Sequence, residues 1–94
     1  MSMEHKSHQI LEEELQKAGK QVKVGGTYSH FKHPERLYKV VSLGVQEGTD
    51  RICVIYRAEY NKDLVFVRDL DSWLEKPKEG IDRFTLVAGG YART

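Results

Sequence analysis

Two pairs of histidines share the spacing His-x-x-His, and metal binding is the first chemistry to test against this sequence. His30 and His33 lie near Glu35, and His5 and His8 repeat the spacing near the N-terminus. Imidazole and carboxylate groups are common zinc ligands. On an extended chain, however, residues three apart point to opposite faces, whereas the ligands of one metal must converge. We therefore expect His30 to hydrogen-bond within its strand, and we expect no metal and no cofactor.

Nucleophilic and acid–base chemistry have weaker support. Cys53, the single cysteine, lies in an apolar run, where a thiol usually acts as a small core side chain rather than a thiolate nucleophile. Asp69 and Asp71 could act as paired carboxylates, but they precede a short helical segment, where acids are expected as caps. Gly25-Gly26 leads into a strand instead of a helix and so does not form a phosphate loop. We expect no catalytic residues and no enzyme activity.

The remaining candidates combine aromatic and cationic side chains, which suit ligand binding because aromatic faces give large contact areas and arginine can fork onto carboxylate or phosphate. Several of them also have a structural explanation: Tyr28, Tyr56 and Phe66 could fill the core, and Trp73 could plug one end of it. Arg68 could be held by a carboxylate such as Glu59. The candidate ligand-binding residues are Tyr28, His30, Lys32, Tyr56, Arg57, Arg68 and Trp73.

Length and composition limit what these residues can belong to. The chain has 94 residues, 39% hydrophobic and 31% charged, which fits one folded domain with a single core and little room for a large catalytic cleft. The net charge of +1 gives no strong attraction to polyanions. A lone cysteine excludes an internal disulfide, and the sequence has no apolar run long enough to span a membrane. We expect a cytoplasmic protein with no membrane contact.

The first 21 residues predict a tail and one amphipathic helix. Over residues 7–20, Leu11, Leu15 and Ala18 recur at helical spacing, with Ile10 beside them. The apolar stripe is narrow and must pack on something. The helix either covers the domain's own core or mediates a weak homodimer; both alternatives remain open.

Residues 22–87 predict a small β domain, and residues 88–94 a flexible tail. Short segments rich in Val, Ile, Tyr and Phe alternate with turn residues, which is typical of an antiparallel meander. The predicted strands cover residues 27–31, 37–45, 51–60, 64–69 and 83–87, with hairpin loops at 46–50 and 61–63.

The third of these strands indicates how the sheet closes. Its beginning, Ile52 to Ile55, is apolar on both faces, whereas Arg57 and Glu59 make one face polar further on. Such a pattern favours a strongly curved sheet, and a small SH3-like five-stranded barrel satisfies it. Ser72 and Glu75 have the spacing of a capping box, which predicts one helical turn before the last strand.

Several ordered motifs resemble one known family. They are Gly-Thr-Tyr-Ser-His-Phe-Lys at 26–32, Leu-Tyr-Lys-Val at 37–40, Val-Ile-Tyr-Arg-Ala-Glu-Tyr at 54–60, Phe-Val-Arg at 66–68, Trp-Leu-Glu at 73–75 and Arg-Phe at 83–84. Over residues 25–86 the chain resembles the bacterial domain of unknown function 1653. The resemblance implies a small SH3-like β-barrel and no established activity, substrate or cofactor.

The sequence departs from the family pattern in three places. Gln46, Glu47, Gly48 and Thr49 stand where members commonly have His-Ser-Glu-Thr. Phe66-Val67-Arg68-Asp69 replaces Trp-x-Arg-Pro, and the segment after Lys32 is longer. If the replaced polar residues carry the family's function, this chain has lost it.

Three classes of function fit these observations. A binding module for a protein or peptide comes first, since a small barrel can present an aromatic groove or a sheet edge without converging catalytic groups. Single-stranded nucleic acid, RNA in particular, is the second class, although the low net charge argues against it. A small-ligand sensor or enzyme accessory domain would need a pocket between the loop at 61–63 and the loop after the first strand.

Overall fold

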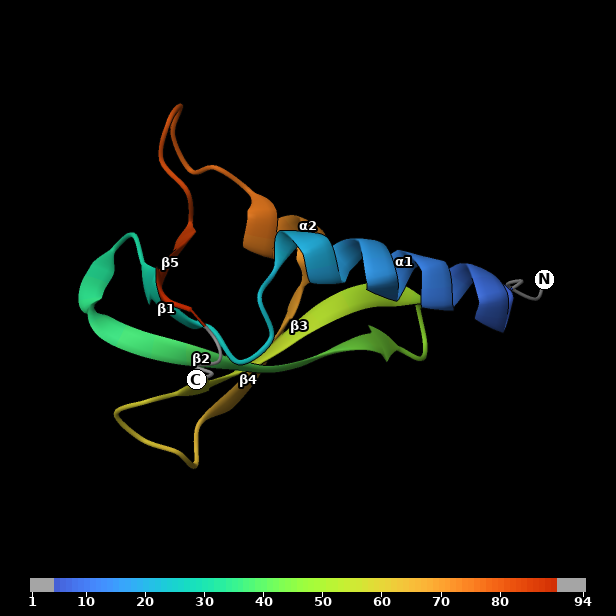
Figure 1. Cartoon of the computed structure of the whole chain (residues 1–94), viewed down its shortest axis with the longest axis horizontal. Coiled ribbons are helices and arrows are strands. Elements are labelled where there is room, and N and C mark those ends of the chain that lie inside the picture. The colour runs from blue at the N-terminus through green and yellow to red at the C-terminus, as the bar shows by residue number, and fades with distance from the viewer. Residues whose placement is uncertain (1–4, 90–94) are drawn as a thin grey trace.

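The computed structural model describes residues 5–89, which form two helices and five strands (Figure 1). Their order along the chain is α1 (His8–Gln21), β1 (Thr27–His30), β2 (His33–Gln46), β3 (Arg51–Ala58), β4 (Val65–Asp69), α2 (Leu70–Leu74) and β5 (Phe84–Ala88). Both helices lie on the same side of one sheet (Figure 1). None of the described helices combines the length and apolarity that a membrane span requires.

Helix α1 begins where the sequence predicts. Ser7 is the N-cap, and its Oγ accepts a hydrogen bond from the backbone N–H of Ile10 at 3.2 Å. Ala18 is fully buried, and Leu11 and Leu15 are half-buried, so the predicted apolar stripe faces inward onto β2 and β3. The helix therefore packs on its own domain's sheet.

The five strands form one antiparallel sheet in the order β4-β3-β2-β1-β5. All five predicted strands are present, but β2 begins four residues earlier, at His33, so that β1 and β2 form a tight hairpin. Pro34 is tolerated there because β3 pairs with β2 only from Tyr38 onward. The missing backbone N–H of Pro34 therefore costs no hydrogen bond to β3. Ala88, predicted to begin a flexible tail, belongs to β5, and residues 90–94 lie outside the described part of the chain.

The predicted closed barrel is wrong: the sheet is open. Within the described residues, no ladder joins the two edge strands β4 and β5. The sheet is nevertheless curved, because the guanidinium of Arg68 on β4 lies 5.4 Å from the ring centroid of Phe84 on β5. Helix α2 begins directly after β4, and its buried Trp73 stacks on Phe84 of β5, between the two edge strands.

A β-bulge at Val41 brings residues from both halves of β2 to the core. Val40 pairs with Tyr56, whereas Ser42 pairs with Ile55, so β2 carries one extra residue. The extra residue resets the alternation, and both Val40 and Leu43 pack in the core. The core also contains Val22, Tyr28, Val54, Tyr56, Trp73 and Phe84.

Helix α2 differs from the predicted capping box. Ser72 lies inside the helix, not at its N-cap, and its Oγ accepts a hydrogen bond from Arg68 Nη1 at 3.0 Å. Asp69 occupies the N-cap position but forms no side-chain cap bond. Its carboxylate instead accepts from Arg51 at 3.1 Å and from the thiol of Cys53 at 3.7 Å. The predicted capping role of Asp69 is therefore wrong, because neighbours on β3 hold its side chain.

The turn between β2 and β3 holds the segment that leads into α1. Asp50 has a left-handed backbone (φ 60°) and is buried. Its carboxylate accepts hydrogen bonds from the backbone N–H of Lys6 at 2.7 Å and from His5 Nδ1 at 3.0 Å. These bonds lower the pKa of Asp50, and the Asp50 carboxylate raises the pKa of His5. The start of α1 is thus fixed to the end of the β2–β3 hairpin.

Candidate functional site

Phe84 is the centre of the aromatic core. Its ring stacks on Trp73 with centroids 3.8 Å apart and an interplanar angle of 4°. Tyr56 and His30 meet the same ring edge-on at 5.6 Å and 5.1 Å. The sheet and α2 thereby bring together three residues that the sequence proposed for ligand binding.

Tyr28, Tyr56 and Trp73 are all buried. The Tyr28 ring lies 5.1 Å from Trp73, and its hydroxyl accepts the backbone N–H of Lys23 at 2.8 Å. Trp73 also meets Tyr56 at 5.0 Å. The structure thus buries these three side chains in the core, which was the structural explanation given for them above. A ligand on this face would instead contact the residues around them.

His30 and Arg68 lie against the ring of Phe84, and Arg83 lies near His30; we call His30, Arg68 and Arg83 the cationic rim. Arg83 donates to Glu75 at 2.9 Å and lies 5.8 Å from the ring centroid of Phe31. His30 Nδ1 accepts the backbone N–H of Lys32 at 3.1 Å. Burial, followed by the nearby charges of Arg68 and Arg83, lowers the pKa of His30. The lowered pKa disfavours a charged His30, and Arg83 is paired with Glu75, so within the described residues Arg68 carries the unpaired positive charge of the rim.

Arg68 is not held by a carboxylate as the sequence suggested. Tyr56 and Ala58 face the core, so Glu59, one residue further along the chain, points to the other side of the sheet. Arg68 instead donates to the hydroxyl of Ser72 and lies over Phe84. Among the described residues no carboxylate forms an ion pair with Arg68.

A second set of rings is exposed beside the rim. Tyr38 meets Tyr60 at 6.0 Å and Phe66 at 6.2 Å, and Arg36 lies 5.8 Å from the centroid of Tyr60. Tyr60 is 54% exposed and Phe66 37% exposed, so Phe66 lies at the edge of the core instead of filling it. Burial, and then a hydrogen bond with Tyr60, raises the pKa of Tyr38 to about 12. We call Tyr60 and Phe66 the exposed rings; Tyr38 beside them is half-buried and packs against the core.

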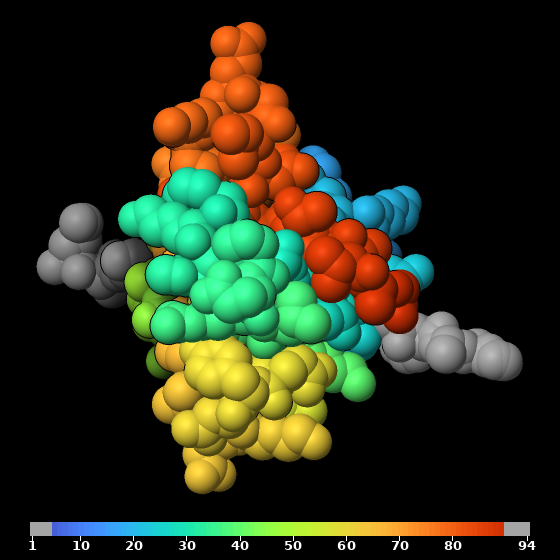
Figure 2. Space-filling model, turned by 90° about the vertical axis from the view of Figure 1, so that its left-hand side faces the viewer, coloured from blue at the N-terminus to red at the C-terminus, as the bar shows by residue number. Residues whose placement is uncertain are grey.

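The sequence did not single out Tyr38, Tyr60 and Arg36 as site residues. The available signal was the two-residue alternation of Arg36, Tyr38 and Val40, which puts these residues on one face of β2. Phe66 and Arg68 share a face of β4 in the same way. Figure 2 shows the β1–β2 hairpin between the loop that precedes β5 and the β3–β4 turn.

Two of the predicted site residues lie apart from this cluster. Arg57 points to the opposite face of the sheet, in register with Lys39 and Val65, and its buried Nε has no hydrogen-bond partner within the described chain. Lys32 follows β1 and lies 5.8 Å from the ring of Phe31, at the outer end of the hairpin. The structure therefore groups His30 and Arg68 on one site and separates Arg57 from them.

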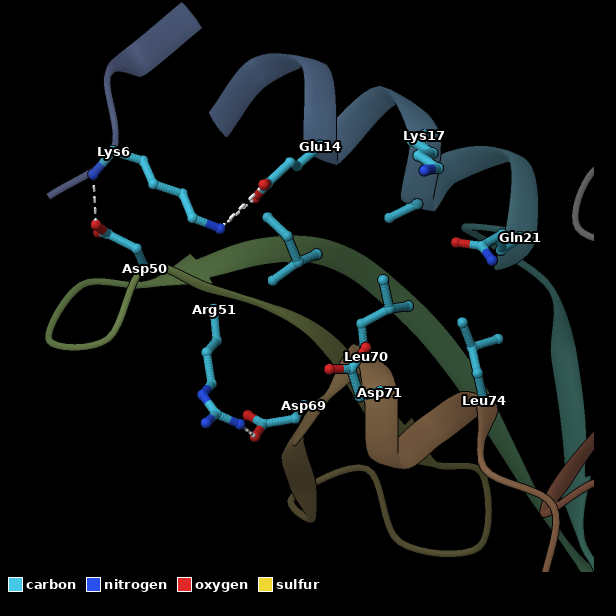
Figure 3. A pocket seen from close by; sticks show the side chains of 12 residues that line it. Lys6, Glu14, Lys17, Gln21, Asp50, Arg51, Asp69, Leu70, Asp71 and Leu74 are labelled. Carbon is cyan, nitrogen blue, oxygen red and sulfur yellow. Dashed lines mark hydrogen bonds and ion pairs between the residues drawn. The ribbon is translucent and has the colours of Figure 1, made fainter. Parts of the chain in front are cut away.

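Two grooves flank α1. The first, with a volume of about 370 Å³, lies between α1 and α2 (Figure 3). Its charges largely neutralise one another, because Lys6 pairs with Glu14 at 2.9 Å and Arg51 with Asp69 at 3.1 Å. The second, of about 450 Å³, lies between the end of α1 and β5 over Tyr28, Trp73 and Phe84. Neither groove includes Arg68, His30 or the exposed rings.

Within residues 5–89, no three His, Cys, Asp or Glu side chains are placed to share a metal ion. His33 pairs with His30 in the β1–β2 hairpin and lies 3.7 Å from Glu35, while the His30 ring meets Phe84. Cys53 is buried, as predicted, and burial raises the pKa of its thiol.

The fold and site define a small domain in which an open five-stranded sheet, covered on one side by two helices, exposes aromatic rings beside an unpaired arginine. The chain belongs to the DUF1653 family of proteins of unknown function, whose family model matches residues 26–86. The chain is also similar to the crystal structure of a DUF1653 protein from Bordetella bronchiseptica, with 26% sequence identity and a TM-score of 0.60. That match covers 78% of this chain and 97% of the other. No curated protein matches the sequence.

Proposed function

We propose that this domain is a non-catalytic binding module that recognises an extended acidic peptide segment of a protein. The binding surface consists of the cationic rim and the exposed rings. Aromatic side chains supply contact area at low cost in rotamer entropy, and arginine supplies a forked donor for a carboxylate. A peptide with carboxylates and apolar side chains matches both.

The observation that carries the proposal is the environment of Arg68. Its guanidinium lies 5.4 Å from the Phe84 centroid, is half-buried, and uses Nη1 for the neutral hydroxyl of Ser72. A partly desolvated guanidinium gains most from a charged acceptor, because charge-assisted hydrogen bonds are about twice as strong as neutral ones. Since Ser72 leaves most of its donors free, the guanidinium is prepared for a ligand carboxylate.

The shape of the surface supports an extended ligand. Both grooves lie outside the rim, whereas Tyr60 and Phe66 are exposed on an open sheet. Small molecules prefer concave sites that bury most of their surface, whereas peptides bind to exposed sheets and shallow surfaces. A non-catalytic role fits the burial and the raised pKa of Cys53.

The test is fluorescence anisotropy with a labelled short peptide that alternates glutamate and valine. Arg68→Gln is expected to weaken binding by about tenfold or more, the size of one lost charged hydrogen bond. Arg57→Gln is the matched control, because Arg57 is the same residue type on the opposite face of the sheet. It should bind the peptide like the wild type.

Single-stranded RNA is the competing ligand, because Tyr60 under Arg36 resembles a platform for base stacking. Labelled poly(U) is therefore titrated in the same buffer, at low and moderate salt. Tight RNA binding that depends on Tyr60 and Arg36, without peptide binding, would replace the peptide proposal. Equal loss of peptide binding in the Arg68 and Arg57 variants would show that this surface is not the site.

A further inference from the structure

Strand β4 is an open edge of the sheet. It pairs with β3 on one side, and within residues 5–89 no strand pairs with its other side. Val65 and Val67 on this strand are 53% and 65% exposed. Proteins usually protect such edges with charges, proline or a covering segment, because unpaired backbone groups readily bind another strand. Here two of the five residues of the strand are exposed valines.

The hydrogen-bond register shows which backbone groups of β4 are unused. Ala58 N–H donates to the Leu64 carbonyl at 3.0 Å, and Glu59 N–H donates to Leu37 on β2 at 2.9 Å. Neighbouring residues in a strand point their backbone groups to opposite sides. Phe66 and Arg68 therefore bond to β3, and the N–H and C=O groups of Val65 and Val67 point away from the sheet.

The two faces of this edge differ in chemistry. Phe66 and Arg68 lie on the same face as the exposed rings and the cationic rim, in register with Tyr56 and Val54. Val65 and Val67 lie on the other face, in register with Arg57 and Ile55. A strand added beside β4 would place alternate side chains next to Arg68 on one face and next to valines on the other.

We propose that β4 binds the acidic peptide as an added antiparallel strand, with its carboxylates on the face of Arg68 and its apolar side chains beside Val65 and Val67. This inference rests on the proposed function and specifies its geometry: backbone hydrogen bonds to Val65 and Val67 give affinity, and Arg68 selects the acidic face. The recognised sequence thus alternates acidic and apolar residues.

Charge complementarity favours a peptide over a second copy of the chain. If two β4 strands paired antiparallel about Val67, Arg68 of each copy would face Phe66 of the other, and Asp69 would face Val65. Neither charge would meet an opposite charge. An acidic peptide supplies the carboxylate that this arrangement lacks.

The experiment uses the full chain and two N-methylated forms of the glutamate–valine peptide. In an antiparallel pair, residues directly opposite share a face, so the peptide valines bond to Val65 and Val67 through their own N–H groups. Methylating the valine nitrogens is expected to weaken binding by about tenfold or more, and methylating the glutamate nitrogens by less than about threefold. Equal effects of the two modifications would overturn the added strand.

Two variants of the protein test the same edge by changing β4 instead of the peptide. Val67→Pro removes the outward N–H and should weaken binding by about tenfold, whereas Val67→Thr keeps the N–H and the branched shape and should bind within about threefold of the wild type. The peptide modifications keep the result interpretable if the proline variant unfolds. Sedimentation without peptide should show a monomer; a dimer that Val67→Pro dissociates would mean that a second copy occupies the edge.

The outcomes separate the two proposals. If the unmodified peptide binds and needs Arg68, but neither methylation pattern matters, the proposed function holds and the added strand is wrong. If the unmodified peptide does not bind, the proposed function is wrong, and the added strand with it.

Discussion

Replacing Trp73 with alanine removes the side chain that fills the space between the two sheet edges. Trp73 is 3% exposed, stacks on Phe84 at 3.8 Å, and meets Tyr28 and Tyr56 edge-on at 5.1 Å and 5.0 Å. Since no ladder joins β4 and β5 within the described residues, the indole and its neighbours hold these edges together. Trp73→Ala should therefore weaken the whole domain and not only α2.

The expected loss of unfolding free energy is about 3–5 kcal/mol, the range for truncating a buried aromatic residue. A small domain is stable by about 5–15 kcal/mol in total, so this is a large fraction. For a domain of this size, each kcal/mol corresponds to about 4–8 °C, which predicts a melting temperature at least about 12 °C lower. Urea unfolding followed by circular dichroism measures the free energy directly.

Leu74→Ala provides the control, because Leu74 is the next residue of α2 and is 38% exposed. Its loss should be clearly smaller than that of Trp73→Ala. A Trp73→Ala variant that loses less than about 1 kcal/mol would refute the reasoning, since the indole would then not be a buried contact between the edges.

Three further outcomes are expected from the titrating groups. Because Asp50 raises the folded-state pKa of His5, while its own pKa is lowered, the stability from this pair should be complete between about pH 4 and about pH 6.5 and should decline as pH rises through the raised pKa of His5. Unfolding measured across this range should lose that dependence in Asp50→Asn. Tyr38 should ionise near pH 12, since burial and the Tyr60 hydrogen bond disfavour its phenolate, and ultraviolet titration of Tyr60→Phe should show a lower Tyr38 pKa. Cys53 is buried with a raised pKa, so a thiol reagent should react with it slowly in the native protein and rapidly in denaturant; fast native reaction would contradict the structure.

The strands were predictable because their signal is local. Alternating apolar residues and the turn residues between them located all five strands, and helical spacing located α1 to within one residue at each end. The bulge at Val41 was not predictable in this way, because it depends on which residues of β3 lie opposite. The start of α2 was misplaced for a similar reason: Arg51 and Cys53 hold Asp69, and Arg68 holds Ser72.

For the site, the aromatic and cationic residue types identified the cluster. They could not show which of its residues lie in the core and which lie on the surface. Tyr28, Tyr56 and Trp73 are chemically suited to either role, and only the packing around Phe84 buries them. Arg57 and Arg68 look equivalent in the sequence, yet the pleat places them on opposite faces of the sheet.

The sequence by itself determined the helices and strands, the antiparallel pairing of strands that follow one another and the burial of Cys53. These features depend on residues that are near one another in the chain. The tertiary structure decided whether the sheet closed, which partner Arg68 received and which rings remained exposed. Each of these depends on contacts between strands distant in the chain, above all on Trp73 of α2 filling the space between β4 and β5. The open edge at Val65 and Val67 follows from that packing, since a closed barrel would have used their backbone groups.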